Sequence, residues 1–244
     1  MKVKFHKLLI CALTLAIAVA YLAIAQDYQP AGDNWITKWW ALEGPITNTG
    51  GFQASAALDW LAEGTGGKLT QELVSTWSGL QLTKTTKVNL PDNGGNLGWT
   101  VITIDPNDGN NMSTAYGLAD ESDIDTYAII VVDSPNERTT TIHPAHDDYA
   151  HIWLNGEKVY DNPNWTTGAT IVTTPTEVSL KKGVNVLLYR CGESGGSDYF
   201  NLHFEASDSD LKIVPTMDDS FFEVLAPVEP AGKLSVTWGD LKRR

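Results

Sequence analysis

The chain contains few residues that could stabilise it covalently. It has 2 cysteines among 244 residues, and Cys11 lies in the apolar N-terminal segment. If residues 1–25 are removed, Cys191 is the only cysteine left, so stability has to come from a hydrophobic core rather than from disulfides. We expect Cys191 to be a small buried residue at the end of a strand.

Positive charge is also scarce. The chain carries 17 lysines and arginines against 30 aspartates and glutamates, for a net charge of −13. An acidic surface of this kind repels nucleic acid and anionic membranes, which excludes nucleic-acid binding as the expected activity.

A metal-centred catalytic pattern is missing from the sequence. The 5 histidines show no zinc-type spacing. We therefore expect a protein that is not an enzyme. The many carboxylates leave open one further alternative, a small glycan-active enzyme.

The N-terminus has the features of a secretory signal. Three lysines precede an uncharged apolar run over residues 8–25, which ends in Ala23-Ile24-Ala25. A basic start, an apolar stretch and a small-x-small end predict a signal peptide over 1–25 and a secreted or cell-surface protein. The run is also long enough for an uncleaved anchor, and membrane contact is expected only there.

Short strands separated by turns dominate the rest of the chain. Asn155-Gly156 between two short β-type runs, 149–154 and 157–160, predicts a β-hairpin, because both residues accept the positive φ angles of a tight turn. Residues 127–132 are continuously apolar, which is typical of a strand buried on both faces. Further strands are expected over 34–45, 98–105, 138–143, 170–180, 184–190 and 200–204.

These patterns predict an all-β fold, an antiparallel jelly-roll β-sandwich, with one short helix over 54–63 and an extended C-terminal tail. Residues 69–77 fit a helical turn or a strand equally well. We expect one sandwich domain over 26–206, a linker over 207–231 rich in aspartate and proline, and a short C-terminal peptide over 232–244.

The region 125–206 resembles the galactose-binding-like jelly rolls of secreted bacterial proteins. Its Asp-Asp hairpin is also similar to that of PA14 domains, β-sandwiches linked to sugar binding and adhesion. The resemblance implies a jelly-roll fold and a tendency toward carbohydrate binding, without fixing a ligand. It is carried by Asp147-Asp148, Trp153-Leu154-Asn155-Gly156, the strand pattern from Lys181 to Leu188, Gly195-Gly196 and Phe200.

Asp147 and Asp148 are the candidate metal ligands. The resemblance implies a Ca²⁺ ion, because in some PA14-type lectins such a pair holds Ca²⁺ that binds sugar hydroxyls. Ca²⁺ takes six to eight oxygen ligands, and Asp198 is a candidate to supply one if its loop approaches. The alternative is that the pair only shapes a turn through hydrogen bonds to the backbone.

Trp165 is the main candidate for ligand contact. A tryptophan stacks well on the apolar face of a sugar ring, and Trp165 lies in a polar loop rather than on a strand. The alternative is that Trp165 folds back as a lid on the sandwich edge. Trp60 and Asn164 are further candidates, and Asn164 also begins a glycosylation sequon.

The sequence therefore predicts a secreted, non-catalytic module that binds carbohydrate or glycan surfaces, with possible help from Ca²⁺. The alternative is a structural or adhesion module that is displayed at the cell surface without binding sugar, with the C-terminal peptide as its anchoring or sorting signal.

Overall fold

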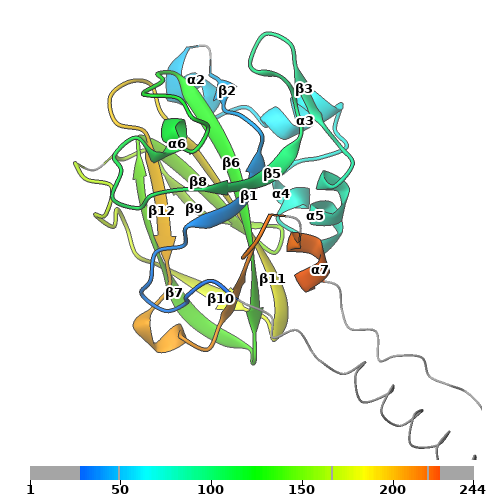
Figure 1. The fold of residues 1–244 in the computed structure, drawn as a ribbon, viewed down its shortest axis with the longest axis vertical. Helices are drawn as coiled ribbons and strands as arrows, with labels where there is room; N and C mark the ends of the chain where they lie inside the picture. Colours follow the sequence, from blue (N-terminus) through cyan, green and yellow to red (C-terminus); the bar gives the residue numbers. More distant parts are fainter. Residues whose placement is uncertain (1–27, 49, 166, 219, 226–244) are drawn as a thin grey trace, which may run out of the picture.

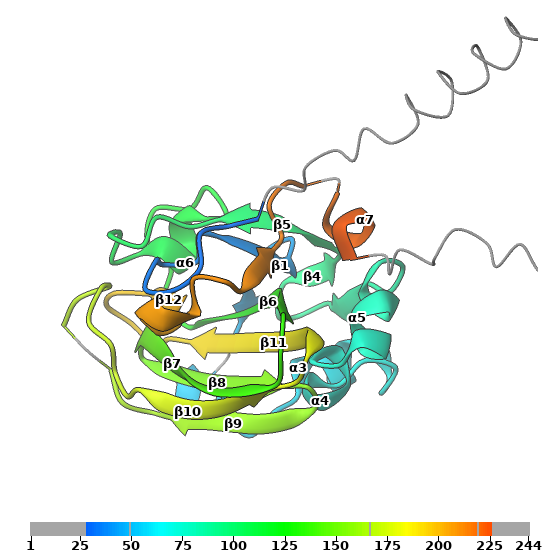
Figure 2. The ribbon, with the colours of Figure 1, turned by 90° about the horizontal axis from the view of Figure 1, so that it is seen from below.

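The computed structural model describes residues 28–225 except 49, 166 and 219. The expected signal peptide and the C-terminal peptide lie outside the described residues. The described chain forms three layers: a small β-sheet, a large β-sheet and a group of short helices (Figure 1, Figure 2). One apolar core lies between the two sheets and a second lies between the large sheet and the helices.

The large sheet is antiparallel and has the strand order β5-β1-β6-β11-β8-β9, with β2 and β13 also paired to β6. Its strands are β1 (Lys38–Leu42), β2 (Ile46–Thr47), β5 (Trp99–Thr103), β6 (Ile124–Ser134), β8 (Tyr149–Leu154), β9 (Glu157–Asn162), β11 (Gly183–Gly192) and β13 (Lys212–Val214).

The small sheet has the order β10-β7-β12 and is also antiparallel. Its strands are β7 (Arg138–Asp147), β10 (Thr176–Leu180) and β12 (Tyr199–His203), and a separate hairpin joins β3 (Val88–Leu90) to β4 (Gly95–Leu97). The all-β sandwich predicted from the sequence is confirmed, whereas its jelly-roll connectivity stays a prediction.

Strand β6 explains the continuous apolar run in the sequence. Ala128, Ile130 and Val132 face the core between the sheets, and the intervening side chains of Ile129 and Val131 face the helical layer. Successive strand residues point to opposite faces, so a strand covered on both sides has to be apolar at every position.

The hairpin at Asn155-Gly156 is confirmed. Strands β8 and β9 pair on either side of it, and the φ angles of Asn155 and Gly156 are 54° and 92°. Both residues lie in the left-handed region, as a two-residue hairpin turn requires.

The helical content exceeds the prediction of one short helix. The helix predicted over 54–63 is interrupted: α2 ends at Ser55 and α3 begins after Asp59. The carboxylate of Asp59 accepts from the backbone N–H groups of Leu61 (3.1 Å) and Ala62 (3.0 Å). Such a side chain ends one segment and caps the next. The helices are α2 (Gly51–Ser55), α3 (Trp60–Thr65), α4 (Gln71–Val74), α5 (Trp77–Thr83), α6 (Asn111–Thr114), η1 (Ala206–Asp208) and α7 (Phe221–Leu225).

The packed structure continues past the boundary expected at residue 206. The sequence predicts a linker from residue 207, whereas β13 pairs with β6 and Ile213 and Val214 are buried. Phe221 of α7 stacks on Trp40, with ring centroids 5.2 Å apart. Strand β13 and helix α7 lie far along the chain from β6 and β1, so the composition of residues 207–231 did not indicate that they pack together.

A buried ion pair joins the helical layer to the large sheet. Arg190 of β11 and Asp125 of β6 are 0% and 1% exposed, and Arg190 Nη2 lies 2.6 Å from Asp125 Oδ2. The guanidinium also donates to the backbone carbonyls of Ser55 (2.7 Å) and Leu58 (2.7 Å). Arg190 therefore links two strands to the segment that carries α2 and α3.

No helix within the described part of the chain is long and apolar enough to cross a membrane.

We predict that Asp125→Asn lowers the free energy of unfolding by about 3–5 kcal/mol, because it leaves the Arg190 charge buried without its partner. Urea unfolding followed by circular dichroism measures the change. The matched control is Asp210→Asn, which breaks the partly exposed pair with Arg138 and should cost much less. Equal losses in the two variants would contradict the role given to Arg190.

Candidate functional site

The structure brings three separate segments together at one end of the sandwich. They are the turn between β7 and β8, the loop between β9 and β10, and the glycine loop after β11. They line a pocket of about 350 Å³ formed by Asp147, Asp148, Trp165, Thr167, Gly195, Gly196 and Ser197. Three residues singled out from the sequence, Asp147, Asp148 and Trp165, therefore share one pocket.

Asp148 is held by the loop that follows β11. Its carboxylate accepts from the backbone N–H (3.1 Å) and the hydroxyl (2.9 Å) of Ser194, and its own N–H donates to the carbonyl of Gly192 (3.1 Å). The peptide bond between Asp147 and Asp148 is cis. Gly195 has a φ of 146°, which allows the loop to turn back toward Asp148 without the strain that a side chain would add.

Asp147 is nearly buried, at 8% exposed. Burial raises the pKa of its carboxyl to about 7, and Asp148 adds to the rise through a hydrogen bond and through its negative charge. Two adjacent carboxylates with little solvent around one of them form a place where positive charge would be stabilising.

Asp198 lies behind the pocket rather than on its wall. It is fully buried, its carboxylate accepts from the hydroxyl of Ser113, and its charge contributes to the raised pKa of Asp147. Burial raises the pKa of Asp198 itself to about 6, although the hydrogen bonds from Ser113 oppose the rise. Asp198 thus supplies negative potential to the pocket.

Glu193 is a residue that the sequence reasoning missed. It follows β11 directly, is fully buried, and neither of its carboxylate oxygens has a hydrogen-bond partner within the described residues. Burial raises its pKa to about 8, and the negative charges of Asp198 and Asp148 add to the rise. The signal available in the sequence was an acidic residue between a buried strand and a glycine loop.

Trp165 is 61% exposed, so it does not fold back as a lid on the sandwich edge. Asn164 beside it is exposed and does not line the pocket; its backbone N–H donates to the side-chain oxygen of Asn162 (2.8 Å), which shapes the loop.

The prediction that Trp60 contacts a ligand is wrong. Trp60 is 7% exposed in the core beneath the helices, and its indole N–H donates to the hydroxyl of Ser55 (2.8 Å). The helix break at Asp59 turns this side chain inward, a consequence that the sequence pattern did not show.

A preformed metal cage is absent from the described part of the chain: no three histidine, cysteine, aspartate or glutamate side chains there could hold a metal ion. An ion beside Asp147 and Asp148 would have to complete its shell with backbone carbonyls, water or ligand hydroxyls. Asp147, Asp198 and Glu193 nevertheless all have raised pKa values, and Glu193 has no hydrogen-bond partner for its oxygens among the described residues. A group of carboxylates of this kind would be stabilised by a bound cation.

The buried histidines have partners elsewhere in the fold. His146 lies 2.8 Å from the hydroxyl of Tyr160 and His151 lies 3.0 Å from Asp161. Burial lowers the pKa of both imidazoles to about 4, so both are neutral at pH 7.

Comparison with known proteins gives weak likenesses. No family model and no curated protein matches the chain. Among solved structures, the PA14 domain of the antifreeze protein MpAFP is 14% identical with a TM-score of 0.39, covering 79% of this chain and 100% of that domain. A family 35 carbohydrate-binding module from Clostridium thermocellum is 18% identical with a TM-score of 0.24, covering 48% of this chain and 79% of the module.

An anti-sigma factor domain-containing protein from Clostridium clariflavum is 13% identical with a TM-score of 0.36, and the match covers 48% of this chain and 40% of that protein. At such low TM-scores these neighbours carry no functional argument, so the site is argued from this chain's own residues.

We predict that stability falls between about pH 6.5 and 8 when divalent cations are removed with EDTA. Glu193 keeps its proton to about pH 8 when folded but loses it near its ordinary pKa of 4.5 when unfolded, so rising pH favours unfolding in this window. Urea unfolding at several pH values measures the slope. Glu193→Gln should reduce the slope, and the part that remains comes from Asp147, whose pKa is also raised. The same slope in Glu193→Gln and the unmodified chain would contradict the assignment.

Proposed function

We propose that the chain is a secreted, non-catalytic carbohydrate-binding module whose site is the pocket between Asp148 and Trp165. The observation that carries the proposal is an exposed tryptophan on the same pocket as two adjacent carboxylates. The secreted location rests on the signal-like sequence of residues 1–25.

Trp165 supplies the apolar half of this recognition. An indole ring presents a flat face to the C–H groups of a pyranose ring, and most of Trp165 is free to do so. Gly195, Gly196 and Ser197 also line the pocket, and their small size leaves room for a ring to enter.

The carboxylates supply the polar half. Sugar hydroxyls donate hydrogen bonds to carboxylate oxygens, and a Ca²⁺ ion on Asp147 and Asp148 would add direct coordination of hydroxyl oxygens. The charge of Asp198 strengthens the negative potential behind the pair, which favours a divalent cation there. Ca²⁺ is thus proposed as an auxiliary ligand rather than as a catalytic group.

We predict that Ca²⁺ raises the melting temperature of the full chain relative to EDTA. Ligand that binds only the folded state stabilises it, by about 2.7 kcal/mol when its concentration is 100 times the dissociation constant. Asp148→Asn should remove the rise, whereas Asp108→Asn in the polar loop over 105–111 should keep it. A rise that survives Asp148→Asn would place Ca²⁺ elsewhere.

We predict that Trp165→Ala reduces glycan binding at least about tenfold on a glycan array with Ca²⁺ present, because it removes the stacking surface. Ile171→Ala is the matched control: Ile171 is an exposed apolar side chain of the same loop that does not line the pocket, so binding should be kept. Absence of glycan binding by the unmodified chain would overturn the proposed function.

A further inference from the structure

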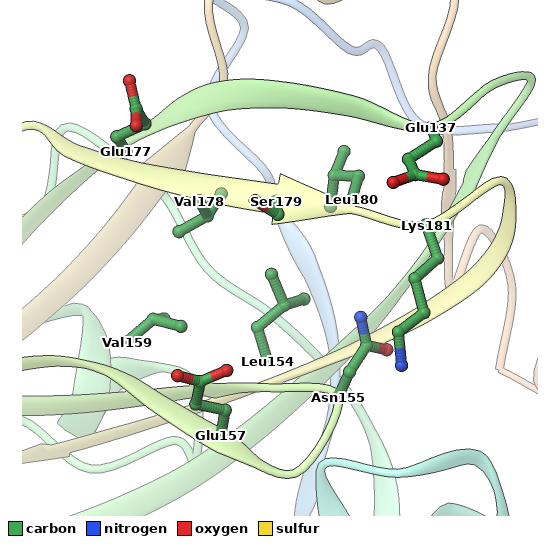
Figure 3. A pocket seen from close by; sticks show the side chains of 10 residues that line it. All are labelled: Glu137, Leu154, Asn155, Glu157, Val159, Glu177, Val178, Ser179, Leu180 and Lys181. Atoms are coloured by element: carbon green, nitrogen blue, oxygen red, sulfur yellow. The ribbon is translucent and has the colours of Figure 1, made fainter.

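A second cavity lies at the opposite end of the sandwich from the candidate site, between the edges of the two sheets. Its volume is about 430 Å³. Figure 3 shows the apolar side chains of Leu154, Val159, Val178 and Leu180 in its middle, with strand β10 on one side and β9 on the other. The lining residues are Glu137, Leu154, Asn155, Glu157, Val159, Glu177, Val178, Ser179, Leu180 and Lys181.

The cavity exists because the two sheet edges diverge. At the last residue of β9, Asn162 Nδ2 donates to Thr174 Oγ1 at 2.9 Å, which holds the edges together at that end. Toward Glu157 and Leu180 the edges separate, and the small sheet ends at β10. A fourth strand beside β10 would fill the gap.

Strand β10 has a free edge on this side. Within the described residues it pairs only with β7, so alternate backbone N–H and C=O groups of Thr176–Leu180 point toward the cavity side without a strand partner. An unpaired edge is a ready template for an added strand, and proteins usually cover or charge such edges.

The rim of the cavity is acidic. It carries Glu137, Glu157 and Glu177 against a single Lys181, and none of these four charged side chains forms a salt bridge within the described part of the chain. The apolar cavity, the free edge of β10 and the acidic rim together favour binding of an extended segment with alternating apolar side chains and net positive charge. The absence of aromatic residues from the lining makes it a poor site for sugar stacking.

The C-terminal segment has this chemistry in its sequence. Residues 233–238 alternate polar residues with Leu234, Val236 and Trp238, and residues 242–244 are all basic. These residues lie outside the described part of the structure. Alternation of this kind places the apolar side chains on one face of a strand.

The length of chain after α7 is sufficient for the segment to reach β10. Lys84 at the end of α5 lies over the ring of Phe222 in α7, with its Nζ 4.7 Å from the ring centroid. Just before the start of α5, the hydroxyl of Ser75 accepts from the N–H of Gly156 (3.0 Å), next to Asn155 of the cavity lining. The chain from Ser75 to Lys84 rises about 14 Å at about 1.5 Å per residue, which sets the distance from α7 to the cavity. Residues 226–232 span up to about 25 Å when extended.

We infer that residues 233–238 of the same chain add to the free edge of β10 as a fourth strand of the small sheet. The side chains of Leu234 and Val236 enter the cavity over Val159 and Val178, and the basic terminus lies against the glutamates of the rim. The segment thereby closes the open edge of the sandwich and blocks edge-to-edge pairing with other molecules.

Hydrogen–deuterium exchange of the full chain tests this inference. The β10 amides that point away from β7 should exchange at least about tenfold more slowly in the unmodified chain than in Val236→Lys, since a lysine would not enter the cavity. Ser235→Lys is the matched control in the segment: it adds the same charge on the opposite face of the strand, so protection should be kept.

A second pair of variants tests the acidic rim. Glu157→Lys should weaken the protection, and Glu72→Lys on the exposed surface of α4 should not. Equal exchange in Val236→Lys and the unmodified chain would overturn the inference. So would protection that rises with protein concentration, because that result assigns the added strand to a second molecule. Glycan binding is measured at the other end of the sandwich, so its failure leaves this test unaffected.

Discussion

The contact between Arg190 and Asp125 is the interaction on which the arrangement of layers depends. Two charges removed from water are tolerated only when their hydrogen-bonding capacity is satisfied. Here Asp125 also accepts from Asn48 (2.7 Å) and Ser55 (2.7 Å), while the guanidinium binds two carbonyls of the helical segment. The pair therefore fixes where the helical layer lies on the large sheet, which apolar packing alone would specify less exactly.

The candidate site is connected to this ion pair through β11. Gly192 lies so close to Asp125 that a Cβ atom at this position would come within 2.4 Å of Asp125 Oδ1. The carbonyl of Gly192 accepts from the N–H of Asp148, and the carbonyl of Glu193 accepts from the side chain of Asn48 (2.9 Å). The rigid layer below thus positions the loop that holds Asp148, and the pocket gains a stable wall.

The two ends of the sandwich differ in chemistry. The end with Asp148 and Trp165 combines an exposed aromatic ring with carboxylates of raised pKa, which suits a polar ligand and a cation. The opposite end presents a free strand edge and an apolar cavity rimmed by glutamates, which suits an extended basic segment. The pocket and the cavity lie at loops and strand edges because apolar side chains of the two cores fill the interior of the sandwich.

The sequence by itself determined the local structure of this protein. Asn155-Gly156 determined a hairpin, because only such residues accept two positive φ angles, and the uninterrupted apolar run in β6 indicated burial on both faces. It also singled out Asp147, Asp148 and Trp165, which the fold brings to one pocket. Tertiary structure decided what depends on distant contacts: the inward turn of Trp60, the pairing of β13 with β6, and the burial of Glu193. Backbone preference acts over a few residues, whereas burial depends on which distant segments cover a side chain.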